Sequence, residues 1–187
     1  MKLQKSKSRP SFKKLASVSI YRARIFELKE VTMRAPDGHR FRHDVVFHPG
    51  AAVIVPVLKG NRFILIKQYR TAVGHVIWEF PAGTLEAGEA PLACAKREIV
   101  EETGFHARKW QKLVSFYPAP GISTEFMHIF LASDLISKQI ELDKDEFIET
   151  EIVPFRRLQK MILDGTIVDA KTMLGFFYYC QKFKIRQ

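Results

Sequence analysis

A segment rich in glycine and glutamate in the middle of the chain constrains its structure most. The segment begins at Gly83 and closes with residues 97–105, which read Arg-Glu-Ile-Val-Glu-Glu-Thr-Gly-Phe. Proline is well tolerated in the first turn of a helix, and glycine is a natural C-terminal cap. The segment therefore predicts a helix that starts near Pro91 and stops at Gly104.

Three glutamates of this helix carry the chemical information. Glu98, Glu101 and Glu102 are spaced three and four residues apart, so their side chains point to one side of a helix. Like charges at this spacing repel, and a cation against them removes the repulsion. Hard divalent cations prefer carboxylate oxygens, so Mg²⁺, or Mn²⁺ as a substitute, is the natural occupant. Arg97 either neutralises part of the cluster or orients Glu89.

The full spacing is far more specific than the carboxylates alone, which most often form a solvated helix face. It reads glycine, five residues, glutamate, seven residues, then Arg-Glu-apolar-X-Glu-Glu-X-Gly-apolar, and every fixed position is present. The segment resembles the Nudix box. This resemblance implies an α/β (α+β) chain with the Nudix fold, in which a mixed sheet is sandwiched between helices.

The resemblance also implies a role for each member of the box. The implied metal ligands are three carboxylates and one backbone carbonyl, those of Glu98, Glu101, Glu102 and Ala82. The implied structural members are Gly83, Glu89, Arg97 and Gly104. The acidic side chains implied in catalysis are Glu98, Glu101, Glu102 and Glu146. The chemistry is metal-assisted cleavage of a pyrophosphate bond by water.

The residues around the box resemble the ADP-ribose pyrophosphatase and nucleotide-sugar hydrolase branch of the family. Residues 66–70 precede Trp-Glu-Phe-Pro-Ala-Gly, a pairing common in that branch, and Pro120 falls fifteen residues after Phe105. The resemblance implies hydrolysis of ADP-ribose or a related nucleoside diphosphate sugar. The implied substrate-binding residues are Arg70, Glu79, Pro120, Gly121, Ser123, Glu125 and Tyr21.

Other interpretations stay open for several of these residues. Arg70 either contacts a phosphate or closes its strand with a surface ion pair. Glu79 either pairs with Arg70 or holds substrate. Tyr21 either stacks on a base or lies in a core or interface. Pro120 and Gly121 either contact substrate or only form a turn.

The second acidic stretch, residues 141–149, is the expected mobile loop that supplies a base or a last metal ligand. Glu146 best matches the loop glutamate of the family. Where relatives often have another acid two residues earlier, this chain has Lys144. This departure leaves open which acid activates the water and which substrate is preferred.

Three regions are expected along the chain. Residues 1–16 form a basic, flexible arm, residues 17–48 form N-terminal strands that make a homodimer and complete the partner's substrate site, and residues 49–187 form the Nudix domain. A turn at residues 35–38 makes the N-terminal strands a hairpin. Further strands are expected at residues 53–58, 63–69, 113–117, 126–132 and 147–153. Further helices are expected from Pro154 to about Asp164 and, capped by Asp169, at residues 170–182.

The net charge of +10 suggests a nucleic-acid partner only at first sight. Six positive charges lie within residues 1–14 and three within residues 182–186, which leaves +1 for the remaining chain. Nucleic acid is therefore not an expected partner. No apolar run is long enough for a membrane span, residues 1–14 lack the apolar stretch of a secretory signal, and only two cysteines occur. The expectation is a cytoplasmic enzyme.

Two rival functions remain. One is a hydrolase that prefers another substrate, either a nucleotide sugar such as GDP-mannose or a damaged nucleoside triphosphate, and Pro120 argues against the triphosphate. The other is a protein without turnover, either a Nudix module that senses a ligand or an RNA-associated protein that uses its basic ends. A sensor would be expected to lose box acids, and this chain retains all three.

Overall fold

The structure is a computed structural model, and it describes residues 11–137 and 148–185. The chain divides into two compact units. Unit 1 contains residues 11–48 and the segment Ala119–Thr124, and unit 2 contains the other described residues. Glu146 and Lys144 lie outside the described residues.

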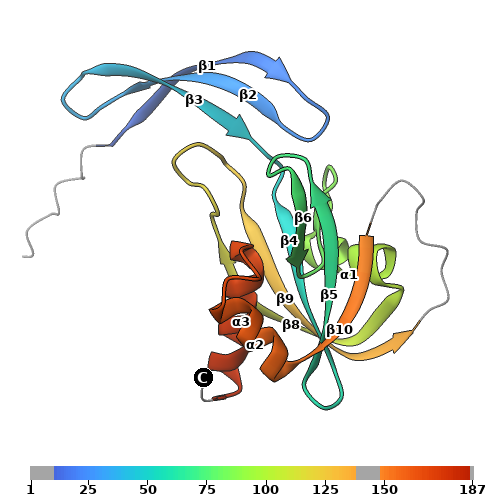
Figure 1. Cartoon of the computed structure of the whole chain (residues 1–187). Helices are drawn as coiled ribbons and strands as arrows, with labels where there is room; N and C mark the ends of the chain where they lie inside the picture. Colours follow the sequence, from blue (N-terminus) through green and yellow to red (C-terminus); the bar gives the residue numbers. More distant parts are fainter. Residues whose placement is uncertain (1–10, 138–147, 186–187) are drawn as a thin grey trace, which may run out of the picture. The chain divides into compact units, whose positions relative to one another are not determined.

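Unit 1 is a three-stranded antiparallel sheet in which β2 (Glu27–Arg34) lies between β1 (Lys13–Arg22) and β3 (Arg40–Phe47) (Figure 1). The expected turn at residues 35–38 joins β2 to β3, with Gly38 N donating to Ala35 O. The expected single hairpin is wrong. A second turn, closed by Ala23 N donating to Phe26 O at 2.9 Å, divides its first arm into two strands.

Strand β1 begins within the residues expected to form a flexible arm. Lys13 and Lys14 pair with Arg34 and Met33 across the sheet. The whole of β1 is exposed, so its lysines pay no desolvation cost in the strand.

The segment Ala119–Thr124 continues the sheet of unit 1 beside β3. Val46 N donates to Ile122 O at 2.8 Å, and Thr124 N donates to Val46 O at 2.9 Å. His48 N donates to the Thr124 hydroxyl at 3.0 Å. This segment, which lies in the sequence between two strands of unit 2, is therefore part of unit 1.

Unit 2 is built on a seven-stranded mixed sheet. Five strands follow the order β10-β5-β4-β9-β8, while β6 pairs with β5 and β7 pairs with β4. Strands β4 and β9 are parallel, and the other pairs are antiparallel. The strands are β4 (Ala51–Leu58), β5 (Arg62–Arg70), β6 (His75–Glu79), β7 (Ala82–Thr84), β8 (Phe105–Phe116), β9 (Met127–Ser137) and β10 (Ile148–Pro154).

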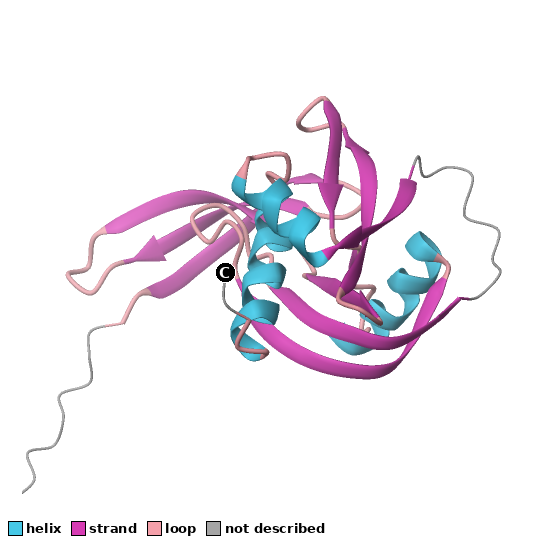
Figure 2. Cartoon of the chain, turned by 60° about the horizontal axis from the view of Figure 1, so that its bottom comes forward, coloured by secondary structure: helices cyan, strands magenta, loops and turns pink. Residues whose placement is uncertain are grey.

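Helices cover both faces of this sheet (Figures 1 and 2). They are α1 (Pro91–Thr103), α2 (Phe155–Leu163) and α3 (Ala170–Lys182). Each face of the sheet carries its own hydrophobic core, and the side chains of β4 alternate between the two. Val53 and Val55 belong to the core formed with α2 and α3, whereas Ala52 and Ile54 belong to the core formed with α1. This confirms the expected sheet sandwiched between helices.

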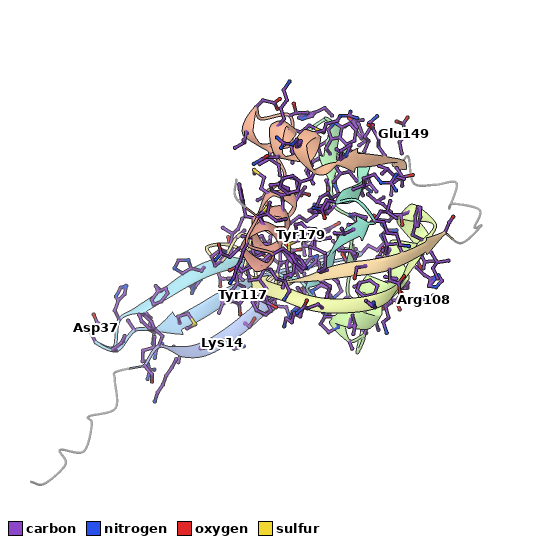
Figure 3. The ribbon with its side chains drawn as sticks, turned by 90° about the horizontal axis from the view of Figure 1, so that it is seen from below. Lys14, Asp37, Arg108, Tyr117, Glu149 and Tyr179 are labelled. Carbon is purple, nitrogen blue, oxygen red and sulfur yellow. The ribbon has the colours of Figure 1, made fainter. Side chains whose placement is uncertain are left out.

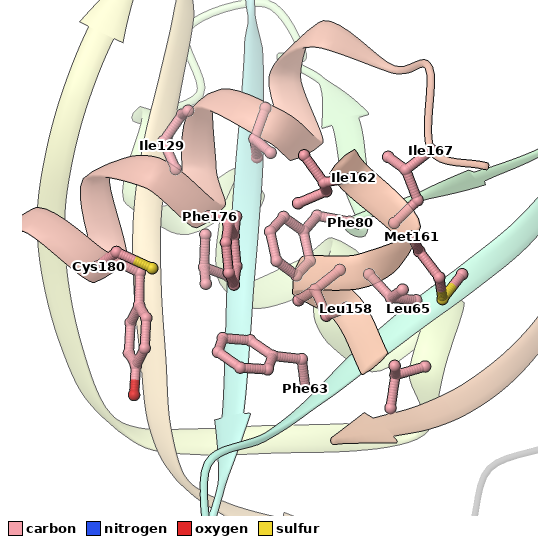
Figure 4. Packing of buried hydrophobic residues seen from close by; sticks show 14 of the residues in the cluster. Phe63, Leu65, Phe80, Ile129, Leu158, Met161, Ile162, Ile167, Phe176 and Cys180 are labelled. Carbon is pink, nitrogen blue, oxygen red and sulfur yellow. The ribbon is translucent and has the colours of Figure 1, made fainter. Parts of the chain in front are cut away.

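The larger core is aromatic. Phe63 and Phe80 of the sheet side meet Phe176 of α3, with ring centroids 6.1 Å apart for the first two and 6.2 Å between Phe63 and Phe176 (Figure 4). Leu158 of α2 is fully buried in the same cluster. This packing fixes α3 against the strand that carries Glu79.

Helix α3 begins as expected, because the Asp169 side chain accepts a hydrogen bond from Thr172 N at 3.0 Å. The sequence also predicts that the apolar face of this helix consists of Met173, Leu174, Phe176, Phe177 and Tyr178, and this prediction is partly wrong. Phe177 and Tyr178 are exposed, and the helix buries Tyr179 and Cys180 in their place. Among the described residues no helix is both long and apolar enough to cross a membrane.

Two strands of the sheet were not expected, and one is longer than expected. Strands β6 and β7 lie between the strand expected at residues 63–69 and the helix expected from Pro91, where the sequence predicts no strand. Strand β8 was expected over residues 113–117 and starts at Phe105. Its early part bears Arg108 and Lys109, which are exposed at the edge of the sheet (Figure 3). Charged side chains are typical of an edge strand, and they concealed the pattern here.

Candidate active site

Helix α1 has the bounds that the sequence predicts. Pro91 occupies its first turn, and Gly104 adopts φ 69° and donates its N–H to Val100 O. This left-handed cap is easily adopted by glycine. The glutamate face of the helix is thereby fixed next to the short strand β7.

Glu98 is seated directly on Gly83. A Cβ atom added to Gly83 would lie 1.7 Å from Glu98 Oε1 and 1.8 Å from its Cδ. Only glycine leaves room for this carboxylate against the backbone of β7. The first glycine of the box therefore makes the space that Glu98 occupies.

Glu102 is held by the backbone of the same strand. Its side chain is buried, and Ala82 N donates to its Oε2 at 2.9 Å. Hydrogen bonds to β4 are made by the residues on either side of Ala82, as when Ile54 N donates to Pro81 O. Antiparallel pairing alternates, so the N–H and C=O of Ala82 both point away from β4, toward the side of Glu102.

Arg97 joins the other carboxylates. Its guanidinium donates to Glu89 at 3.1 and 3.2 Å, to Glu98 at 2.7 Å and to Glu101 at 2.9 Å. It also donates to Thr84 O at 3.4 Å. The hydrogen bonds from Arg97 lower the pKa of Glu89, and those carboxylates raise the pKa of Arg97. Arg97 thus both orients Glu89 and neutralises part of the cluster.

The charge and donor types of this cluster fit a hard divalent cation. Four carboxylates against one guanidinium leave a net charge of −3, and all the side-chain donors are oxygens of the kind that Mg²⁺ prefers. Glu98 and Glu101 are bound to Arg97, and within residues 11–137 and 148–185 no three acidic, histidine or cysteine side chains converge on one point. The residues fit the cation in chemistry, with Arg97 as their present partner.

A second charged cluster lies beside the box. Glu79 at the end of β6 is fully buried, and Arg70 Nε and Nη2 donate to its two oxygens at 2.6 and 2.7 Å. Lys171 of α3 donates to Glu79 Oε2 and, at 3.0 Å, to Asp169 Oδ1. Burial alone would raise the pKa of Glu79, but the Arg70 hydrogen bonds and the Lys171 charge outweigh it and lower that pKa.

The Arg70 guanidinium interacts electrostatically with Glu102 of the box. Its hydrogen bonds to Glu79 raise its pKa, and the charges of Glu102 and Asp169 raise it further. Of the two readings of Glu79, the structure shows pairing with Arg70. Arg70 nevertheless keeps 39% of its side chain exposed.

The remaining candidate residues belong to other parts of the chain than the box helix. Tyr21 on β1 and three residues of the returning segment, Pro120, Gly121 and Ser123, all belong to unit 1. Glu125 belongs to unit 2, and Glu146 lies outside the described residues. Their expected contact with substrate stays a prediction.

Lys171 is the member of the site that the sequence interpretation missed. It lies in the first turn of α3, where the helix dipole disfavours a cation. Lys171 lies two residues after the capping Asp169, and its partner Glu79 is 92 positions away, so no local pattern of the sequence identifies it.

Cys94 yields a test of how closely the box is packed. Its buried thiol lies 3.5 Å from Gly83 O, and burial together with the charges of Glu98 and Glu89 raises its pKa to about 12. At pH 8 only about one thiol in 10⁴ would be ionised. Cys180 is also a buried thiol. We expect Ellman's reagent to find no reactive thiol in the native protein at pH 8 and two in denaturant. Rapid stoichiometric reaction of the native protein would contradict this packing.

The fold and this site define a class of protein, and comparison with known sequences agrees. The NUDIX domain model matches residues 47–174, and the chain belongs to the NUDIX domain family. The chain is 36% identical over 168 residues to the ADP-ribose pyrophosphatase of Bacillus subtilis (strain 168), an alignment that covers 89% of this chain and 91% of that protein.

Two further relatives are similar over most of their length. The GDP-mannose pyrophosphatase of Escherichia coli O1:K1 / APEC is 33% identical over 168 residues, which cover 82% of this chain and 87% of that protein. A solved structure described as an ADP compounds hydrolase has a TM-score of 0.83 and 26% identity, and covers 96% of this chain and 97% of that one.

Proposed function

We propose that this chain hydrolyses the pyrophosphate bond of ADP-ribose or of a related nucleoside diphosphate sugar. The main support is the position of two box carboxylates. The Glu98 carboxylate packs against Gly83, and the Glu102 carboxylate accepts a hydrogen bond from Ala82 N. This arrangement fixes two carboxylates of an anionic cluster against one backbone strand. The names of the Bacillus subtilis and Escherichia coli relatives support the class of substrate.

The box supplies the ligands for a divalent cation, which we propose to be Mg²⁺ with Mn²⁺ as a substitute. The cation would neutralise diphosphate charge and ease deprotonation of the attacking water, and its ligands would be Glu98, Glu101, Glu102 and the Ala82 carbonyl. The seat of Glu98 and the hydrogen bond to Glu102 hold these two carboxylates before substrate arrives. Such preorganisation avoids rearranging charged groups during the reaction.

Arg70 has the geometry of a phosphate contact. Its Nε and Nη2 donate to Glu79, and 39% of the Arg70 side chain is exposed. Charge-assisted hydrogen bonds from arginine to phosphate are strong and directional. We propose that Arg70 binds the diphosphate and screens the charge of the leaving phosphate.

The reaction joins a water oxygen to one phosphorus and breaks the bond from that phosphorus to the bridging oxygen. A box glutamate or Glu146 accepts the proton of the water. The products are a nucleoside monophosphate and a sugar phosphate. For ADP-ribose these are AMP and ribose 5-phosphate.

We further propose that the enzyme is a cytoplasmic homodimer joined through unit 1. The support is strand β1, which exposes Val18, Ile20 and Tyr21 at 54 to 60%. An exposed edge strand with apolar side chains is a ready surface for pairing with a second chain. The two buried cysteine thiols fit a reducing compartment.

A substrate panel tests the function. We expect phosphate-containing products from ADP-ribose with Mg²⁺ and none with excess chelator, assayed in parallel with GDP-mannose, UDP-glucose, ADP-glucose and 8-oxo-dGTP. If a nucleotide sugar is cleaved fastest, the proposed reaction stands and the preferred substrate is that nucleotide sugar instead of ADP-ribose. Tight binding of one compound without cleavage of any would contradict the hydrolase and identify a sensor.

A further inference from the structure

The most unusual charged group outside the box is the lysine at the start of α3. Lys171 is 8% exposed, and a lysine is rarely buried unless it is paired. Its two partners are Glu79, which is fully buried, and Asp169, the helix cap. The contact with Glu79 joins two residues 92 positions apart.

The cluster is electrically balanced only when Lys171 is present. Glu79 and Asp169 carry two negative charges, and Arg70 and Lys171 carry two positive charges. Without Lys171 the two carboxylates would act on Arg70 alone. The positive potential at Arg70 would then fall. The orientation of the Arg70 guanidinium would also be less well defined, because Glu79 would lose the hydrogen bond that holds its Oε2.

The geometry gives each charge a separate task. Lys171 binds Oε2 of Glu79, and Glu79 binds Arg70 through both oxygens. The fork geometry of a guanidinium on a carboxylate is planar and directional, so the orientation of Glu79 fixes that of Arg70. The orientation of Glu79 is in turn held by α3, because Lys171 shares the oxygen Oε2 with Arg70 Nη2.

We propose that Lys171 is a positioning residue of the active site, which aims Arg70 at the diphosphate by holding Glu79. The proposal rests on the proposed function, because it takes Arg70 as the phosphate contact. The opposing interpretation is that Lys171 serves only to dock α3 on the sheet.

The matched control lies on the same helix. Tyr179 OH donates to Asn61 Oδ1 at 3.0 Å, a contact that also anchors α3 but does not touch the charged cluster. Figure 3 labels Tyr179, and Lys171 lies two turns earlier on the helix. Tyr179→Phe therefore removes one anchoring hydrogen bond without changing Arg70.

The kinetic experiment compares Lys171→Met, Lys171→Arg and Tyr179→Phe with the wild type. We expect Lys171→Met to raise the KM for the preferred substrate about tenfold or more, with a smaller change in kcat. Lys171→Arg should restore most of the affinity, and Tyr179→Phe should lower Tm without moving KM. A wild-type KM in Lys171→Met, or an equal rise in Tyr179→Phe, would overturn the proposal. If Lys171→Met does not fold, Lys171→Gln removes the charge while keeping a donor, and the same expectation applies.

A second readout does not depend on turnover. The Arg70 Nε–H resonance, assigned by its loss in Arg70→Lys, reports the hydrogen bond to Glu79 in the protein alone. It should shift and exchange faster with water in Lys171→Met, and stay unchanged in Tyr179→Phe. An unchanged resonance in Lys171→Met would overturn the proposal even if no substrate of the panel is cleaved. Absence of cleavage by the wild type, in contrast, would overturn only the proposed function.

Discussion

Glu102→Gln is expected to lower kcat by roughly 10²–10³-fold while leaving the fold intact. The amide is nearly the same size as the carboxylate, and its oxygen can still accept the hydrogen bond from Ala82 N. The change therefore removes a negative charge from the box and little else. Circular dichroism and thermal melting should match the wild type, with the free energy of unfolding changed by less than about 1 kcal/mol.

The control for Glu102→Gln is Glu151→Gln on β10. Glu151 is ion-paired with Lys67 and Arg157, neither of which belongs to the box. This variant should keep full activity, since an exposed ion pair contributes little. Equal activity in Glu102→Gln and the wild type would sink the assignment of Glu102 as a ligand. A matching loss in both variants would show that the effect is not specific to the box.

Gly83→Ala is expected to abolish most activity at a small cost in stability. The new methyl group would take the place of the Glu98 carboxylate, whose atoms lie within 1.7 to 2.4 Å of it. These atoms belong to a flexible side chain, so Glu98 moves aside and the backbone stays. Displacing a catalytic group by about 1 Å costs about 10²-fold in rate. Steady-state kinetics and thermal melting measure the two effects separately.

Gly60→Ala is the control, and it is expected to lower stability without lowering activity. Gly60 has φ +77° in the turn before β5, and nothing lies near the position of its added Cβ. An alanine there costs about 1–2 kcal/mol of backbone strain. We expect a lower Tm with normal activity per folded molecule. If Gly83→Ala instead loses stability and keeps its kcat, then Glu98 does not need this seat.

The parts of the structure that the sequence predicts well are those set by local chemistry. Helix α1 starts at Pro91 and ends before Gly104, and α3 is capped by Asp169, because capping involves neighbours within four residues. The parts that it predicts poorly depend on distant partners. The charged residues at the sheet edge obscure the strand pattern in the first half of β8. Phe177 and Tyr178 of α3 are exposed, and which face of an aromatic-rich helix is buried depends on the elements that it packs against.

The active site divides in the same way. The spacing of Glu98, Glu101 and Glu102 is a property of one helix, so the sequence predicts it. The sequence suggests only that Gly83 allows a tight loop, whereas the structure shows that it is the seat of Glu98. Lys171 is out of reach of any local pattern, because its partner is 92 residues away and is reached only once α3 has packed on the sheet.

Arg97 makes the box helix independent of an outside cation for its folding. Some small metalloproteins remain unfolded until they bind a metal, because the binding free energy of the metal drives their folding. Here an internal counterion already bridges Glu89, Glu98 and Glu101. We therefore expect the amount of folded protein to be independent of metal supply, so that changes in the free cation concentration would act on the rate of the proposed reaction.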